Sequence, residues 1–149
     1  MIQRKQTLFL IELIFLGLAL LFVPCQNILT QTGATHVYLM PLVDFQSTAG
    51  HLFAVILNFI GLILATITIF IYKKRTLQVK LCYALIAIWL VLPAMMLFCP
   101  FVVKTEAILE VKTNYFVVAI ALFSIIAGYL AARFIKKDID LLKSADRIR

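Results

Sequence analysis

Long apolar runs separated by short polar segments dominate the chain. The runs cover residues 7–24, 51–72, 81–99 and 115–135. Each run is close to the roughly 20 residues that a helix needs to cross the hydrocarbon core of a bilayer. The pattern predicts an all-α integral membrane bundle of four transmembrane helices, formed by one membrane domain over residues 1–149.

The fourth run leads into a charged tail, residues 136–149, that keeps a helical period. Apolar residues recur at three- and four-residue steps, at Ile135, Ile139, Leu142, Ala145 and Ile148, whereas lysines lie on other faces. We therefore expect the fourth helix to extend beyond the membrane as a cytoplasmic amphipathic helix. A tail that only anchors the chain and a tail that docks onto a partner both fit this pattern.

Two longer segments, 26–50 and 100–114, join the first helix to the second and the third to the fourth. The first contains Gly33 and Pro41, and the second begins at Pro100, so we interpret both as loops. Pro24 precedes Cys25 where a cleavable signal would carry small residues. We therefore expect the first helix to be retained.

The basic residues are distributed unevenly along this pattern. Two lie in the head, four in the connection after the second helix, and six at the end of the chain, which together are twelve of the 14 lysines and arginines. The remaining two, Lys104 and Lys112, fall on the other side. The positive-inside rule then places both termini and the central connection in the cytoplasm. The prediction is a multi-pass protein of the bacterial inner membrane.

Composition excludes several classes of function. The chain is 64% hydrophobic and only 14% charged, whereas soluble domains are about a quarter charged. The net charge of +7 flanks the apolar runs, as topology signals do, so it does not indicate nucleic-acid binding. We find no clustered nucleophile, base or metal-ligand set and no phosphate loop. The sequence therefore predicts no enzyme activity, no metal and no cofactor.

Polar residues inside the apolar runs are the first candidates for a function. Glu12 lies in the first run, where a carboxylate is costly and is usually paired or functional. A structural pair with Lys5, Arg75, Lys80 or Arg133, a proton- or ion-coupled role, and contact with a partner subunit are the alternatives. Asn58 is interpreted as hydrogen-bonding glue between helices, and Arg133 as an anchor whose head reaches the membrane surface.

Small residues predict which helix faces meet, because lipid supplies no hydrophobic drive between helices. Stripes with three- and four-residue spacing occur in the second, third and fourth runs: Ala54, Asn58, Gly61, Ala65 and Thr68; Ala84, Ala87, Val91 and Ala94; and Ala121, Ser124, Gly128 and Ala131. We expect these three helices to pack closely on one another and the first helix to be more peripheral. Cys25 and Cys99 both fall at the outer ends of their helices, where a disulfide could form in an oxidising compartment.

Three short motifs carry a resemblance to a known family. They are Met1-Ile2-Gln3-Arg4 with Gln6, Arg75-Thr76-Leu77-Gln78-Val79-Lys80-Leu81, and Lys143-Ser144-Ala145-Asp146-Arg147-Ile148-Arg149. In this order they resemble a family of small four-span inner-membrane proteins from Bacteroidetes-type bacteria, catalogued as a domain of unknown function. The resemblance covers the whole chain and implies no activity.

The resemblance draws attention to polar residues on the predicted cytoplasmic side. We expect a cytoplasmic polar cluster or partner-docking surface from Gln3, Arg4, Arg75, Gln78, Lys80, Arg133, Asp146 and Arg147. Such groups make charge-assisted hydrogen bonds, either in an intramolecular clasp or with another protein.

These observations favour a non-enzymatic accessory subunit or assembly factor of a larger inner-membrane complex. Its partners would be the lipid bilayer and other membrane subunits, or further copies of itself. The alternative is a small transporter or proton-coupled carrier that uses Glu12 and Asn58. A weaker third is a membrane enzyme acting on lipid or quinone.

Overall fold

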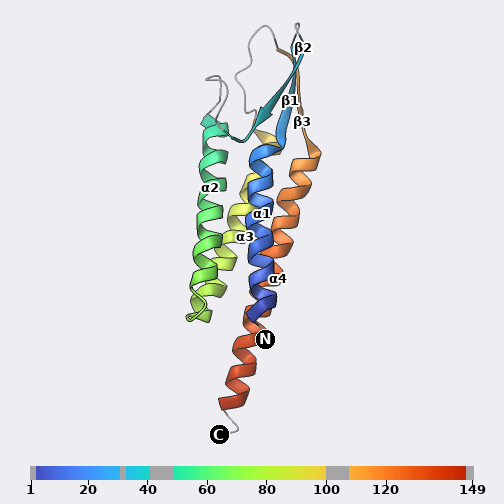
Figure 1. Cartoon of the computed structure of the whole chain (residues 1–149). Helices are drawn as coiled ribbons and strands as arrows, with labels where there is room; N and C mark the ends of the chain where they lie inside the picture. The colour runs from blue at the N-terminus through green and yellow to red at the C-terminus, as the bar shows by residue number, and fades with distance from the viewer. Residues whose placement is uncertain (1–2, 31–32, 41–48, 100–107, 147–149) are drawn as a thin grey trace.

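Helices arranged lengthwise make up most of the molecule. The computed structural model describes residues 3–30, 33–40, 49–99 and 108–146. Within them α1 (Gln3–Phe22), α2 (Ala49–Phe70), α3 (Arg75–Phe98) and α4 (Tyr115–Asp146) lie side by side (Figure 1). Each helix packs against two neighbours in the order α1, α2, α3 and α4, and α4 packs back against α1. The prediction of four helices is confirmed, although α3 begins at Arg75 and not at residue 81.

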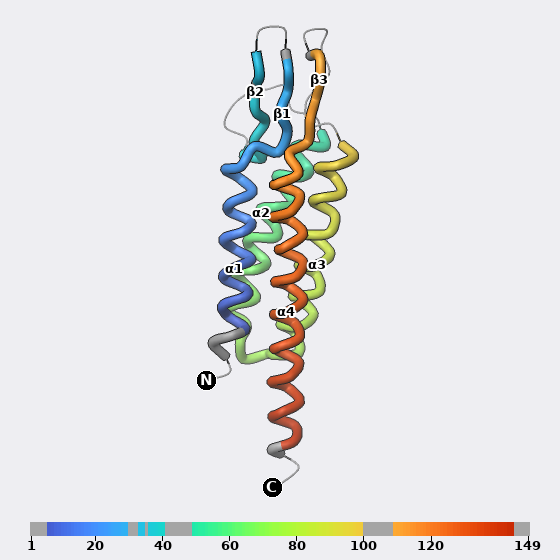
Figure 2. Tube along the Cα trace, turned by 90° about the vertical axis from the view of Figure 1, so that its right-hand side faces the viewer, coloured from blue at the N-terminus to red at the C-terminus, as the bar shows by residue number. Residues whose placement is uncertain are grey.

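A small antiparallel sheet at one end of the bundle corrects the all-α prediction. Its strands are β1 (Pro24–Thr30), β2 (Gly33–Tyr38) and β3 (Ile108–Thr113), in the order β2-β1-β3. Both segments that we interpreted as loops therefore contain strands. Since both lie at the same end of the bundle, their backbones pair with each other (Figure 2). Gly33 faces Thr30 in the hairpin with a φ of 147°, which favours glycine.

Asn114 joins the sheet to the helices. Its backbone N–H donates to the Cys25 carbonyl at 2.9 Å, and its side-chain Nδ2 donates to the Pro24 carbonyl at 2.9 Å. Its Oδ1 accepts from the backbone N–H of Phe116 at 3.1 Å, which caps the start of α4. One residue thus connects the beginning of the central strand to the start of α4.

Trp89 of α3 fills the middle of the bundle. It is fully buried and packs against glycines of two other helices. A Cβ added at Gly17 would lie 2.8 Å from the Trp89 ring, and one added at Gly61 would lie 3.5 Å from it. Small residues on α1 and α2 therefore make room for one large residue on α3.

This packing corrects the predicted face of α3. Its predicted stripe, Ala84, Ala87, Val91 and Ala94, is exposed, and the buried face carries larger residues that include Cys82, Leu85, Trp89, Leu92 and Met96. The physical reason is that a stripe of small residues marks an interface only where two backbones come close together. The large side chains of α3 instead fill the space that small residues leave on the neighbouring helices. The stripes on α2 and α4 are buried as predicted.

The prediction that α1 is peripheral was also wrong. This helix lies between α2 and α4, and its Leu10, Leu13 and Leu20 are fully buried. The three later helices do not form a compact group of their own, because α2 and α4 are each flanked by α1 and α3.

The outward surfaces of the helices are apolar. Phe53, Ile56, Ile60 and Ile63 on α2 are each about half exposed, and similar residues cover the other helices. Three helices, α2, α3 and the part of α4 from Tyr115 to Ser144, are long and apolar enough to cross a membrane, and the apolar part of α1, Gln6–Phe22, is shorter. These features are those of a membrane protein.

The end of α4 extends past the other helices. Figures 1 and 2 show it continuing as one helix beyond the start of α1 and beyond the connection between α2 and α3. The predicted extension of the fourth helix is thus confirmed as far as Asp146. At the base of this extension the Lys136 ammonium lies 5.1 Å from the centre of the Tyr83 ring, a cation–π contact between α4 and α3.

Candidate functional site

Three helices meet in a polar network at the end of the bundle away from the sheet. Gln6 of α1 donates through Nε2 to Oδ2 of Asp138 on α4 at 2.6 Å, and to the Phe134 carbonyl at 3.3 Å. The Arg75 guanidinium, at the start of α3, lies 3.7 Å from the same Asp138 oxygen. We call Gln6, Arg75 and Asp138 the basal network.

The burial of the network follows from the positions of its residues. Gln6 precedes Leu10 and Leu13 on the inner face of α1, and Asp138 follows Ile135 on the inner face of α4. The Asp138 side chain is only 4% exposed, whereas that of Arg75 is 25% exposed. A buried carboxylate needs a charge partner and hydrogen bonds. Arg75 supplies the charge, and Gln6 supplies a hydrogen bond. The network therefore holds the bases of α1, α3 and α4 together.

One oxygen of the network has no partner among the residues that the structure describes. Asp138 Oδ1 is buried and makes no hydrogen bond there, while Oδ2 accepts the hydrogen bond from Gln6 and forms the ion pair with Arg75. The carboxylate keeps the capacity to accept one more donor.

A second polar contact joins the end of α2 to the start of α3. Gln78 Nε2 donates to the Thr68 carbonyl at 3.1 Å, and the Thr68 hydroxyl donates to the Leu64 carbonyl at 2.7 Å. Carbonyls in the last turn of a helix have no partner within it. Gln78 therefore supplies a donor where α2 ends and holds the turn against α3.

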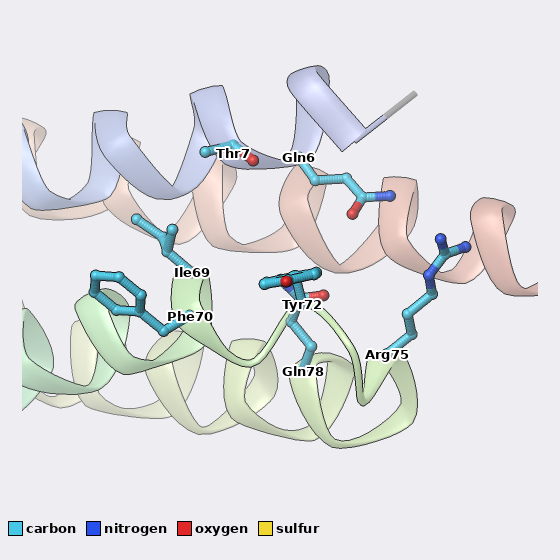
Figure 3. A pocket seen from close by; sticks show the side chains of 7 residues that line it. All are labelled: Gln6, Thr7, Ile69, Phe70, Tyr72, Arg75 and Gln78. Atoms are coloured by element: carbon cyan, nitrogen blue, oxygen red, sulfur yellow. The ribbon is translucent and has the colours of Figure 1, made fainter. Parts of the chain in front are cut away.

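A half-open pocket of about 330 Å³ lies beside the basal network. Gln6, Thr7, Tyr72, Arg75 and Gln78 give it polar walls, and Ile69 and Phe70 give it an apolar side. Figure 3 shows Gln6 extending from α1 and Arg75 from α3 toward the same side of the pocket. Its amide, hydroxyl and guanidinium groups can hydrogen-bond a ligand or partner, but they do not form a nucleophile–base pair.

The residues expected in a cytoplasmic polar cluster lie in different places in the structure. Arg75 and Gln78 take part in the contacts above, whereas Lys80 and Arg133 are exposed and lie outside the basal network. The side chains of Gln3, Arg4 and Asp146, and all of Arg147, lie outside the described part of the structure.

Sequence reasoning missed Gln6 and Asp138 as site residues. The signal was present, because both occupy positions on apolar helical faces, Asp138 in step with Ala131, Ile135 and Leu142. A polar residue at such a position is buried if the helix packs and so requires a partner.

The polar candidates of the apolar runs, Glu12 of α1 and Asn58 of α2, do not meet in the structure. Asn58 is fully buried, and its Nδ2 donates to the Gly17 carbonyl of α1 at 3.2 Å. Glu12 is exposed on the outer side of α1. The structure therefore brings Asn58 to α1 and does not bring it together with Glu12.

The cysteines Cys25, Cys82 and Cys99 are free thiols in the structure. Cys25 lies in β1 with its side chain fully buried, and this burial raises the pKa of its thiol to about 12 from the ordinary 9.0. The thiol is thus protonated at neutral pH and unreactive while the sheet stays folded. Gln26 Nε2 donates to the Cys99 carbonyl at 3.2 Å, so β1 passes close to the end of α3. A Cys25–Cys99 disulfide stays a prediction.

The comparison with protein families identifies the chain's relatives. The family described as a domain of unknown function, DUF4293, matches residues 2–148. The chain belongs to the DUF4293 family. The match covers the whole bundle, the sheet and the basal network of this DUF4293 protein. No curated protein and no solved structure matches it. The family description names no activity.

Proposed function

We propose that this DUF4293 protein is a non-enzymatic accessory subunit or scaffold of a larger complex in the bacterial inner membrane. The observation that carries the proposal is the end of α4, which extends beyond the bundle as a single helix. The exposed Leu141 and Leu142 of this extension are 47% and 50% accessible. A tail that served only for topology would need cations and no exposed leucine pair.

The basal network gives this extension a fixed direction. Asp138 is held by Gln6 near the start of α1 and by Arg75 at the start of α3, and α4 continues from there to Asp146. The leucines follow within one turn of Asp138. The helix is therefore preorganised before binding, which reduces the conformational entropy that association would cost.

The orientation of the protein in the membrane is part of the proposal. Lys73, Lys74, Lys80, Lys136 and Lys137 are exposed at the end that carries the basal network. The sheet end carries Lys112, which is paired with Glu110 at 3.2 Å. By the positive-inside rule the α4 extension is cytoplasmic, so its partner has a surface on that side.

The carrier hypothesis has less support from the geometry. A carrier that used Glu12 and Asn58 would need both side chains to face one path through the bundle. Asn58 faces the interior and binds α1, while Glu12 faces outward from the same helix. Leu13 of α1 and Trp89 of α3 are fully buried and fill space in the bundle interior that such a path would need.

The test is a pull-down of the tagged protein from its native host in mild detergent, followed by mass spectrometry. We expect a stoichiometric membrane partner with the wild type and about tenfold less of it with Leu141→Ser/Leu142→Ser. Asp140→Asn is the matched control, because it changes the same exposed turn and removes no apolar surface. Recovery of the wild type alone or only as a self-oligomer would overturn the proposal.

A further inference from the structure

Two ionisable side chains face outward from neighbouring helices within the apolar surface of the bundle. Glu12 on α1 and Arg133 on α4 are both exposed. The ion pairs among the described residues are Arg75–Asp138 and Lys112–Glu110, so Glu12 and Arg133 are not paired with each other in the single chain. A charge that faces lipid is unfavourable, and such residues normally find a partner.

The two side chains lie on the exposed sides of two helices that pack against each other. On α1 it contains Leu8, Glu12 and Phe15, and on α4 it contains Leu122, Ile126, Tyr129 and Arg133. Within each helix these residues follow three- and four-residue steps and so share one side. We call this surface the α1/α4 face.

Glu12 and Arg133 also lie at nearly the same height. Phe9 of α1 stacks on Phe134 of α4, with ring centres 5.4 Å apart, which sets the two helices in register. Glu12 is three residues beyond Phe9 toward the sheet, a rise of about 4.5 Å, and Arg133 is one residue from Phe134 in the same direction, about 1.5 Å. The difference of about 3 Å is within the reach of an arginine side chain.

We propose that the α1/α4 face binds the same face of a second copy across a two-fold axis along the membrane normal, with Glu12 of each copy paired to Arg133 of the other. Rotation about such an axis leaves every height unchanged and places α1 of one copy opposite α4 of the other. The interface is then isologous, and both ion pairs form at once.

Charge complementarity indicates that the partner on this face is a second copy of the chain. The face carries one acid and one base at matched height, so it is complementary to itself. The axis also keeps both copies in the same orientation, as their shared charge asymmetry requires. The inference does not depend on a different protein docking on the α4 extension.

The experiment uses charge reversal in two differently tagged copies, reconstituted in lipid vesicles and scored by resonance energy transfer. We expect wild-type copies to associate. Glu12→Lys alone and Arg133→Glu alone should each weaken self-association about tenfold or more, because both pairs become like-charged. A mixture of Glu12→Lys with Arg133→Glu should restore association, since both pairs across that mixed interface are again opposite in charge.

The mixture separates this proposal from a salt bridge within one chain. If Glu12 and Arg133 paired within one copy, each single variant would be impaired and mixing would not help. Mixing that fails to restore association, or single variants that associate as the wild type does, would overturn the proposal. Lys80→Glu is the matched reversal at an exposed position of α3, outside the α1/α4 face, and should have no effect.

Milder variants keep the test decisive if a charge reversal prevents folding. Glu12→Gln and Arg133→Gln remove the attraction without adding repulsion, and both should weaken association by a smaller factor than the reversals. Circular dichroism in detergent shows which variants are helical before association is scored. Folded Glu12→Gln copies that associate as tightly as the wild type would contradict the proposal.

Discussion

At the scale of single residues, Gln6 and Asp138 stand where helical periodicity would otherwise place apolar side chains. Each is acceptable because the other lies within 2.6 Å and Arg75 adds a charge. A buried polar pair of this kind contributes little net stability, yet leaving one member unpaired is costly. The basal network therefore favours one arrangement of the helix bases over alternatives.

This asymmetry leads to a prediction about Asp138. Asp138→Ala should lower the free energy of unfolding by about 1–3 kcal/mol, because it leaves the buried Gln6 amide with only its longer hydrogen bond, to the Phe134 carbonyl. Arg75 is partly exposed and can turn to water, which limits the loss. Reversible unfolding in mixed micelles gives the measurement.

The control for this prediction removes both polar groups. Gln6→Leu combined with Asp138→Leu should be closer in stability to the wild type than Asp138→Ala is, since no buried polar group is left unpaired. A double variant that is less stable than the single variant would show that the network contributes directly to stability.

At the scale of elements, the sequence predicts the helices well and the sheet poorly. Runs such as residues 51–72 are uncharged and long, so few structures other than a helix can satisfy their backbone in a membrane. The strands are short, and β1 pairs with β3 across a large separation in the sequence, with Asn27 facing Lys112. The alternation of apolar and polar residues from Leu109 to Thr113 indicates a strand, but the nearby sequence does not indicate which strand it pairs with.

The helix faces show the same limit. The stripes on α2 and α4 were predictable, because glycine and alanine mark close approach. The buried face of α3 was not predictable from small residues, because its Trp89 fills the space that Gly17 and Gly61 leave on the neighbouring helices. Such complementarity between large and small residues depends on how three helices are arranged, and one helix alone does not encode it. The basal network escaped prediction for the same reason.

Asn114 provides a test of the junction between the sheet and the helices. Asn114→Ala removes the hydrogen bond to Pro24 and the cap on α4, and it should lower the free energy of unfolding by about 1–2 kcal/mol. Hydrogen exchange should show faster opening of β3 and of the first turn of α4. Thr66→Ala is a suitable control, because Thr66 is exposed and bonds only within α2. Equal exchange in both variants would argue against this role for Asn114.

At the scale of the whole molecule, the two ends of the bundle differ in kind. One end carries the sheet, and the other carries the basal network, the basic connection between α2 and α3, and the α4 extension. The start of α1 and the end of α4 lie at that second end. The apolar part of α1 is shorter than the other three helices, so α1 is the helix whose crossing is most informative to test.

Reporter fusions test this topology. We expect a fluorescent protein that matures only in the cytoplasm to be bright at either terminus, and alkaline phosphatase, which is active only outside, to be inactive there. Phosphatase inserted at Gly33, in the hairpin of β1 and β2, should be active. The cause is the concentration of basic residues at the network end, which resist translocation.

If α1 did not cross, an N-terminal reporter would lie on the side of the sheet, opposite to a C-terminal one. Substituting Lys112 by Gln should leave the pattern unchanged, because that lysine is paired with Glu110 on the sheet side.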